Sequence, residues 1–164
     1  MVIGDPYKFS ICVQTIGEWN LDDTFCNGVL LFCIDGVLFP NEIITATLKC
    51  EIPPLEDLLS HVALNDSIYN MEKEAAFKEM YNRTFPEDMD VDNDYRYFIS
   101  PPSLADDGCF AFAVTNSTHV RILAARLRYS VELSQYLFDG IEIKEAIISL
   151  SELNQMVNAL SKAY

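Results

Sequence analysis

The N-terminal third of the chain alternates large apolar and polar side chains, which is the two-residue period of a β-strand. Residues 7–14 place Tyr, Phe, Ile and Val at every second position, so a strand with one buried face is expected there. Residues 28–40 contain two apolar runs separated by Asp35-Gly36, a dipeptide that favours a two-residue hairpin turn. Residues 42–52 are predicted to form a further strand that ends at Pro53-Pro54.

The middle of the chain changes to the period of a helix. Residues 55–62 place three leucines and a valine at i, i+3, i+4 and i+7, directly after two prolines that suit a first helical turn. Residues 67–82 carry a second apolar stripe, and Asp66 or Ser67 is the expected N-cap. The pattern therefore predicts two central helices.

Strand-like alternation returns in the last part of the chain and gives way to one more helix. The predicted segments are a short strand at 95–100, a loop at 101–108, and strands at 109–115, 119–129 and 141–150. Ser149 and Glu152 then have the spacing of a capping box. Apolar residues at 150, 153, 156, 157 and 160 form the inner stripe of a C-terminal helix.

This order of elements predicts an α+β fold, with a mostly antiparallel β-sheet, two central helices and a C-terminal amphipathic helix. At 164 residues, half of them hydrophobic, the chain is expected to form a single domain over residues 1–164. The N-terminus lacks the basic and apolar segments of a signal peptide. The longest purely apolar run, residues 29–34, is too short to span a bilayer.

The charge balance limits the possible partners. The chain has 25 Asp and Glu against 11 Lys and Arg, a net charge of −14. Nucleic acid and anionic membranes would repel such a chain, so neither is expected as a direct partner. The balance suits a soluble cytoplasmic protein, or one that binds a basic protein. The five cysteines form no CxxC pair and are expected to be small buried side chains in a reducing compartment.

Residues 86–97, PEDMDVDNDYRY, hold the densest run of carboxylates. A calcium loop needs Gly at position 6 and a bidentate Glu at position 12. A loop starting at Asp88 has Asn93 and Ile99 there, and one starting at Asp90 has Tyr95 and Pro101. The spacing therefore does not support an EF-hand, and no metal site is expected. A hydrated acidic loop and an acidic face for a basic partner remain as alternatives.

The sequence offers little material for catalysis. The two histidines, His61 and His119, stand near no recognised nucleophile motif, and the scattered glycines form no phosphate-binding loop. We therefore expect no enzyme activity and no cofactor. Arg121, Arg126 and Arg128 lie close in sequence but do not share one strand face, so intramolecular pairing with the surplus acids is their expected role.

Several stretches together resemble the immunity proteins of bacterial polymorphic toxin systems, specifically immunity protein family forty-two, found beside contact-dependent growth inhibition toxins. They are IGDPYKFSICVQTIGEWN (3–20), DGVLFPNEI (35–43), FAFAVTNSTHVRILAARLRY (110–129) and IEIKEAIISLSELNQMVNAL (141–160). The resemblance follows most of the chain in order and is weakest across residues 54–103. It implies a cytoplasmic protein that binds the C-terminal toxin domain of a secreted protein, expected to be basic and a nuclease, and blocks it by stoichiometric inhibition.

The family carries no motif for toxin contacts, so the expected contact surface is chosen on charge. An acidic surface can compete for the basic groups that a nuclease presents to phosphates. The expected partner-binding residues are Glu87, Asp88, Asp90, Asp92, Asp94, Tyr95 and Tyr97. Two other functions stay open: an acidic protein-binding adaptor, and a small hydrolase that uses His61 or His119.

Overall fold

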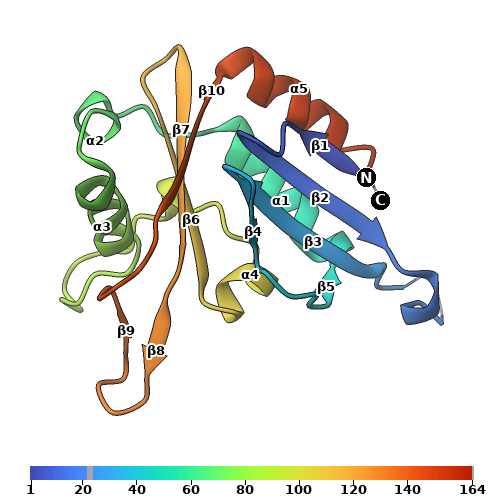
Figure 1. The fold of residues 1–164 in the computed structure, drawn as a ribbon, viewed down its shortest axis with the longest axis horizontal. Helices are drawn as coiled ribbons and strands as arrows, with labels where there is room; N and C mark the ends of the chain where they lie inside the picture. Colours follow the sequence, from blue (N-terminus) through green and yellow to red (C-terminus); the bar gives the residue numbers. More distant parts are fainter. Residues whose placement is uncertain (22–23, 164) are drawn as a thin grey trace.

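The N-terminal strands form a five-stranded antiparallel sheet in the computed structural model, which describes residues 1–21 and 24–163. The strands are β1 (Val2–Gly4), β2 (Phe9–Thr15), β3 (Asn27–Ile34), β4 (Val37–Phe39) and β5 (Ala46–Thr47). Strands β1 to β4 pair in chain order, and β5 pairs with the start of β3. We refer to this as the large sheet (Figure 1).

Three later strands form a second antiparallel sheet in the middle of the molecule (Figure 1). They are β6 (Cys109–Thr115), β7 (His119–Arg126) and β10 (Lys144–Ser149), with β7 in the centre. One residue after β7, the chain enters a separate two-stranded ribbon made of β8 (Arg128–Ser130) and β9 (Gln135–Leu137). The ribbon extends away from the middle sheet at one end of the molecule (Figure 1).

The helices divide between the two sides of the middle sheet. They are α1 (Leu48–Ser60), α2 (Asp66–Tyr69), α3 (Lys73–Thr84), α4 (Pro102–Asp106) and α5 (Leu150–Leu160), with 3₁₀ turns η1 (Gly17–Trp19) and η2 (Tyr95–Tyr97). Helices α1 and α5 pack together on the side of the large sheet, whereas α2 and α3 lie on the opposite side (Figure 1).

The middle sheet is buried on both faces because it separates two hydrophobic cores. In β6, Ala111 and Ala113 face the core formed with the large sheet, α1 and α5. Phe110 and Phe112 face the core formed with α3 and the ribbon. This arrangement explains why the segment CFAFAVT is buried at every position instead of alternating between core and solvent.

Several predicted features are confirmed, beginning with the α+β class and the C-terminal helix. Asp35 and Gly36 join β3 to β4 with φ angles of 50° and 74°, as a two-residue hairpin turn requires. The capping box of α5 is also present, because the Ser149 hydroxyl accepts a hydrogen bond from the Glu152 N–H at 3.1 Å. The Glu152 carboxylate in turn accepts one from the Ser149 N–H at 2.7 Å.

The strand predicted at residues 42–52 is wrong. Only β5 is extended there, and α1 begins at Leu48 and continues through both prolines. A helical stripe of Leu48, Ile52, Leu55 and Leu59, all buried, spans the prolines and outweighs the helix hydrogen bonds that they remove. Both prolines are exposed, so they lie on the face of α1 away from this stripe.

The helix predicted at residues 67–82 is interrupted and has a different cap. It is divided into α2 and α3. The cap is Asn65, whose side chain accepts a hydrogen bond from the Ile68 N–H at 3.1 Å. The break has a physical cause in the buried side chain of Arg121. Its guanidinium donates to the carbonyl oxygens of Tyr69 at 2.8 Å and Met71 at 2.6 Å, between the two helices.

Residues 95–100 and 101–108 also differ from the prediction. The first segment contains the turn η2. It pairs with β6 through a bridge between Phe98 and Phe112, next to which the Ile99 N–H donates to the Ala111 carbonyl oxygen at 3.0 Å. The second contains α4, which begins at a proline, the residue preferred at a first helical position. Strands β1 and β9 were not predicted, since three-residue strands carry too little periodicity to detect.

The cysteines are free thiols, but only some are buried. Cys33 and Cys109 are buried, Cys12 and Cys26 are half-buried, and Cys50 is exposed on α1. The expectation that all five are core side chains is therefore wrong for Cys50. Its exposure follows from the correction at α1, because the strand predicted there is a helix whose solvent-facing side carries this position.

Candidate functional site

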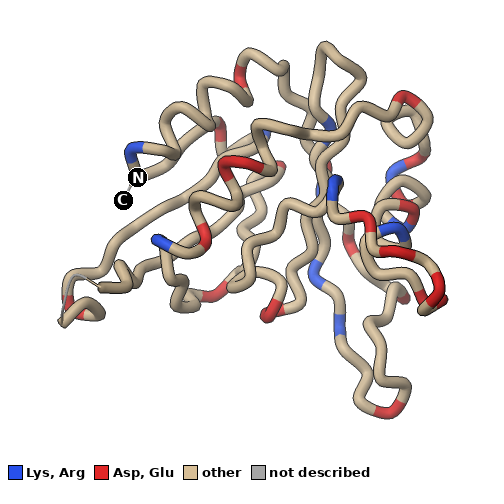
Figure 2. The backbone as a smooth tube through the Cα atoms, turned by 180° about the vertical axis from the view of Figure 1, so that it is seen from behind, with Lys and Arg blue, Asp and Glu red and all other residues tan. Residues whose placement is uncertain are grey.

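The acidic stretch after α3 is a loop held close to the helix by backbone contacts. The Asn93 side chain donates to the carbonyl oxygen of Thr84 at 2.7 Å, and the Asp94 N–H donates to that of Arg83 at 2.8 Å. Asp88 and Asp90 are exposed, and the Asp88 carboxylate accepts the Asp90 N–H at 3.0 Å. Figure 2 shows this loop as a run of acidic positions beside α3.

Four of the seven predicted contact residues are exposed carboxylates without an ion pair in the part of the chain that the structure describes. They are Glu87, Asp88, Asp90 and Asp92. Their negative charge is therefore presented to solvent, not neutralised by a neighbouring side chain. They form the acidic loop referred to below.

The other three predicted residues have different surroundings. Two hydrogen bonds of 2.8 Å from the Arg96 guanidinium neutralise Asp94 and hold its carboxyl pKa below the usual range. Tyr95 is half exposed, with its ring centroid 6.2 Å from that of Phe85. Tyr97 is 2% exposed, so its side chain belongs to the core and not to the surface.

Next to the acidic loop lies a cavity of about 520 Å³, which we call the aromatic pocket. Seven of its lining side chains are aromatic, contributed by α3, β6, the ribbon and the segments between them. Tyr81 of α3 lies 4.8 Å from Phe138, and Phe110 of β6 lies 4.8 Å from Tyr136, measured between ring centroids. Both pairs meet edge to face, an arrangement that aromatic quadrupoles favour.

Among the residues that the structure describes, two carboxylates, Glu87 and Asp106, are the only charged side chains that line the aromatic pocket. Burial raises the pKa of Tyr81 to about 12, with a smaller contribution from the neighbouring Tyr136. The pKa of Tyr136 is also raised, first by burial and then by the negative charge of Asp106. The pocket therefore combines apolar walls with a negative rim.

The ribbon adds exposed apolar groups to the same side of the molecule. At its tip, Val131 is 83% and Leu133 is 61% exposed, and Tyr129 at the pocket is 50% exposed. Single exposed apolar side chains are common, but these three lie together on or next to the ribbon beside the aromatic pocket. Apolar groups beside an acidic rim are typical of a protein-binding surface.

The sequence did not indicate the aromatic pocket. Tyr129 of the ribbon lies at the end of the strand predicted at 119–129, but β9 with Tyr136, and Phe138 directly after it, were missing from the prediction. The short run of strand-favouring side chains Tyr136, Leu137 and Phe138 was the available signal.

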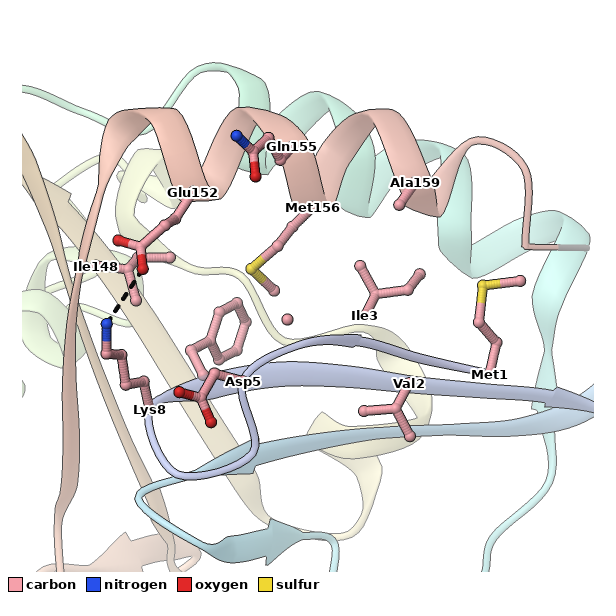
Figure 3. A pocket seen from close by; sticks show the side chains of 12 residues that line it. Met1, Val2, Ile3, Asp5, Lys8, Ile148, Glu152, Gln155, Met156 and Ala159 are labelled. Atoms are coloured by element: carbon pink, nitrogen blue, oxygen red, sulfur yellow. Dashed lines mark hydrogen bonds and ion pairs between the residues drawn. The ribbon is translucent and has the colours of Figure 1, made fainter.

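A second cavity, of about 420 Å³, lies between β1 and α5 (Figure 3). Its floor is apolar, with Ile3 and Met156 facing each other, and at one end Lys8 pairs with Glu152 at 3.2 Å (Figure 3). The Glu152 carboxylate also completes the capping box of α5. Lys8 and Glu152 therefore hold elements of the fold together, and the third charged side chain at the cavity, Asp5, accepts the Tyr7 N–H at 2.9 Å.

The two histidines stand apart from both cavities. His61 is exposed at the end of α1, with its Nδ1 atom 2.9 Å from the carbonyl oxygen of Asp57 and 3.2 Å from the Asp57 carboxylate. His119 is exposed at the start of β7, with Nδ1 3.0 Å from the Thr118 hydroxyl. Within residues 1–21 and 24–163, no three His, Cys, Asp or Glu side chains converge to hold a metal ion.

Intramolecular pairing with acids was predicted for all three clustered arginines and is confirmed for two, Arg121 and Arg126. Arg121 is buried and donates to the Glu145 carboxylate at 2.5 Å. Arg126 pairs with Glu42 and Asp107, both at 3.0 Å. These contacts use the positive charge of Arg121 and Arg126 within the chain, whereas Arg128 is exposed.

Comparisons with known proteins agree with this picture of a binding protein. A search of curated proteins finds no match. Among solved structures, the chain is similar to the one described as "Crystal structure of CdiI from Burkholderia dolosa AUO158", with a TM-score of 0.77 and 23% sequence identity. The similarity covers 99% of each chain, and at this identity it establishes the fold. The family model for Immunity protein 42 matches residues 1–163, and the chain therefore belongs to this family of immunity proteins.

Proposed function

We propose that this protein protects its cell in contact-dependent growth inhibition by binding one cognate toxin domain in the cytoplasm. The observation that carries the proposal is the family match, which extends over residues 1–163. The similarity to a protein titled CdiI agrees with it over nearly the full length of both chains. Protection is by stoichiometric binding, and the protein needs no catalytic step.

The charge distribution supports a basic target, which we propose to be a nuclease. A nuclease presents Lys and Arg to phosphate groups, and a protein of net charge −14 attracts the same groups. The acidic loop offers four unpaired carboxylates to such a surface. Binding there would exclude the nucleic acid by occupying the residues that contact it.

A cytoplasmic site of action is part of the proposal, because a toxin that cleaves nucleic acid acts there. Across the described parts of the chain, no helix has the length and hydropathy needed to cross a membrane. The dispersed histidines support inhibition without catalysis, since neither is placed at a cavity with a nucleophile.

The direct test is co-expression with the toxin region encoded by the neighbouring gene. We expect the two chains to co-purify in equal amounts, and we expect this protein to rescue growth against that toxin and not against an unrelated one. The double variant His61→Ala/His119→Ala should protect fully, because both side chains are exposed and neither lines one of the two cavities. Failure to form a complex with any adjacent gene product would overturn the proposal.

A second experiment tests the acidic loop as the surface that attracts the toxin. The triple variant Asp88→Asn/Asp90→Asn/Asp92→Asn removes three charges and keeps side chains that can accept the loop's hydrogen bonds. We expect slower association at low salt and a weaker dependence of the association rate on ionic strength. Asp94 is left unchanged because it is paired with Arg96. An unchanged association rate at low salt would leave the loop with no role beyond solvation.

A further inference from the structure

The aromatic pocket has the walls of a cation-binding site. Its rings meet at steep angles, 87° between Tyr81 and Phe138 and 75° between Phe110 and Tyr136. These rings pack edge to face instead of stacking in a flat layer, and they line the cavity of about 520 Å³. A cation within about 6 Å of an aromatic ring face is attracted by the negative face of the ring quadrupole.

The charges around the aromatic pocket favour the same kind of occupant. Neither Lys nor Arg lines the pocket, whereas Glu87 and Asp106 do. Neither carboxylate forms an ion pair among the residues that the structure describes. A neutral apolar guest would bury these carboxylates without a partner, which is costly, while a basic side chain would satisfy them.

The protein already places its own cations against rings of this cluster. The Lys78 ammonium lies 5.6 Å from the centroid of the Phe138 ring, which lines the pocket. The Arg96 guanidinium lies 5.9 Å from the ring of Tyr97, in the same core. Neither cation lines the pocket itself, so its interior remains open to a cation from outside.

We propose that the aromatic pocket receives one Arg or Lys side chain of the cognate toxin domain and anchors the complex there. The proposal rests on the proposed function and adds the contact that gives it specificity. Glu87 and Asp106 bind the charged end of the incoming side chain, and the rings of Tyr129 and Tyr136 contact its stem and its cationic group. The exposed apolar tip of the ribbon then contacts the toxin surface around the anchor.

The chemistry of the pocket can be tested without the toxin. Nα-acetyl-L-argininamide and its neutral isostere Nα-acetyl-L-citrullinamide are titrated into the protein at millimolar concentration, with amide NMR shifts as the readout. We expect saturable shifts at Asp106, Tyr129 and Tyr136 with the arginine compound, and none with the citrulline compound. An equal response to both compounds, or to neither, would overturn the proposal.

The use of the pocket is tested in the toxin complex. Tyr129→Leu removes a half-exposed ring and leaves the buried rings in place, so the fold is retained. We expect the dissociation constant to rise roughly 2- to 30-fold, the range of one cation–π contact. The charge variant Glu87→Gln/Asp106→Asn should raise it roughly 2- to 5-fold per charge. Its matched control is Glu18→Gln/Asp35→Asn, which removes the same two charges outside the pocket and should have less effect.

A double-mutant cycle identifies the toxin side chain that enters the aromatic pocket. Each surface Lys and Arg of the toxin is changed to Met, and its effect is measured against wild type and against Tyr129→Leu. One basic position should couple, so that the double change costs little more than either single change. Coupling to an apolar toxin residue, or to none, would overturn the pocket proposal while leaving the immunity function standing. If no complex forms at all, the function fails, and the argininamide titration still decides whether the pocket binds a cation.

Discussion

Arg121 is expected to be the costliest single side chain to remove on the α3 side of the molecule. It is 6% exposed in the central strand β7, and its guanidinium binds three acceptors at once. Two of these acceptors are the carbonyl oxygens of Tyr69 and Met71, where the chain passes from α2 to α3. The third is the carboxylate of Glu145 on β10. The substitution Arg121→Met keeps the apolar stem and removes all three hydrogen bonds.

The magnitude follows from the burial of the donors. Removing one partner of a buried ion pair typically costs about 3–5 kcal/mol. The Glu145 side chain is 33% exposed, but the carbonyl groups of Tyr69 and Met71 also lose their donor. For a chain of this length each kcal/mol lowers the melting temperature by about 2–4 °C, so the loss is about 6–20 °C. The matched control is Arg126→Met, whose ion pairs are largely exposed and contribute about 0–1 kcal/mol.

Urea unfolding followed by circular dichroism measures both variants. The double variant Arg121→Met/Glu145→Met separates the two parts of the effect. It removes the unpaired carboxylate but leaves the two carbonyl groups without a donor, so only part of the lost free energy of unfolding should return. A loss below about 1 kcal/mol for Arg121→Met would refute the reasoning, since it would equal that of the exposed control. Full recovery in the double variant would refute the role assigned to the carbonyl contacts.

Three other changes test separate parts of the fold. Hydrogen bonds at the α5 cap lower the pKa of Glu152 from 4.5 to about 2. The stability that its carboxylate contributes is therefore complete above pH 4.5 and lost as the pH falls toward 2, and Glu152→Gln should make the free energy of unfolding less dependent on pH in that window. Glu51, 7% exposed, accepts three hydrogen bonds, and Glu51→Ala should cost roughly 2–4 kcal/mol in urea unfolding. Gly4 has φ +98°, and an added Cβ would lie 2.5 Å from the Phe9 carbonyl oxygen; Gly4→Ala should lower the melting temperature, whereas Gly17→Ala, in open space, should not.

The parts of the fold that could be predicted are those with local signals. The Asp35-Gly36 turn and the α5 capping box each depend on residues close in sequence, and both are confirmed. The strand predicted at 42–52 was wrong because its apolar positions fit both the two-residue period of a strand and the 3.6-residue period of a helix. Packing of α1 against α5 and the large sheet decides between them, and that contact is not encoded within the segment.

The candidate site was predicted less completely, for the same reason. The acidic loop is contiguous in sequence and was found, whereas the aromatic pocket brings together residues from Tyr81 to Phe138. Tyr97 shows the opposite error, because it was predicted at the surface and lies in the core. Its position beside carboxylates suggested exposure, but its hydroxyl accepts a hydrogen bond from Asn65 at 3.0 Å inside the core. Whether the exposed members of the predicted set contact a toxin stays a prediction.

The acidic loop and the aromatic pocket would contribute to toxin binding in different ways. Long-range attraction depends on net charge and is screened over about 8 Å at physiological ionic strength, so the loop would act before contact and change the association rate. The pocket acts only when a side chain is inside it, so it would change the dissociation rate. Any basic toxin would be attracted by a charge of −14, and attraction alone therefore could not distinguish a cognate toxin from another. Discrimination would have to come from a shaped contact, and the pocket beside the loop provides one at the place where an attracted basic surface would arrive.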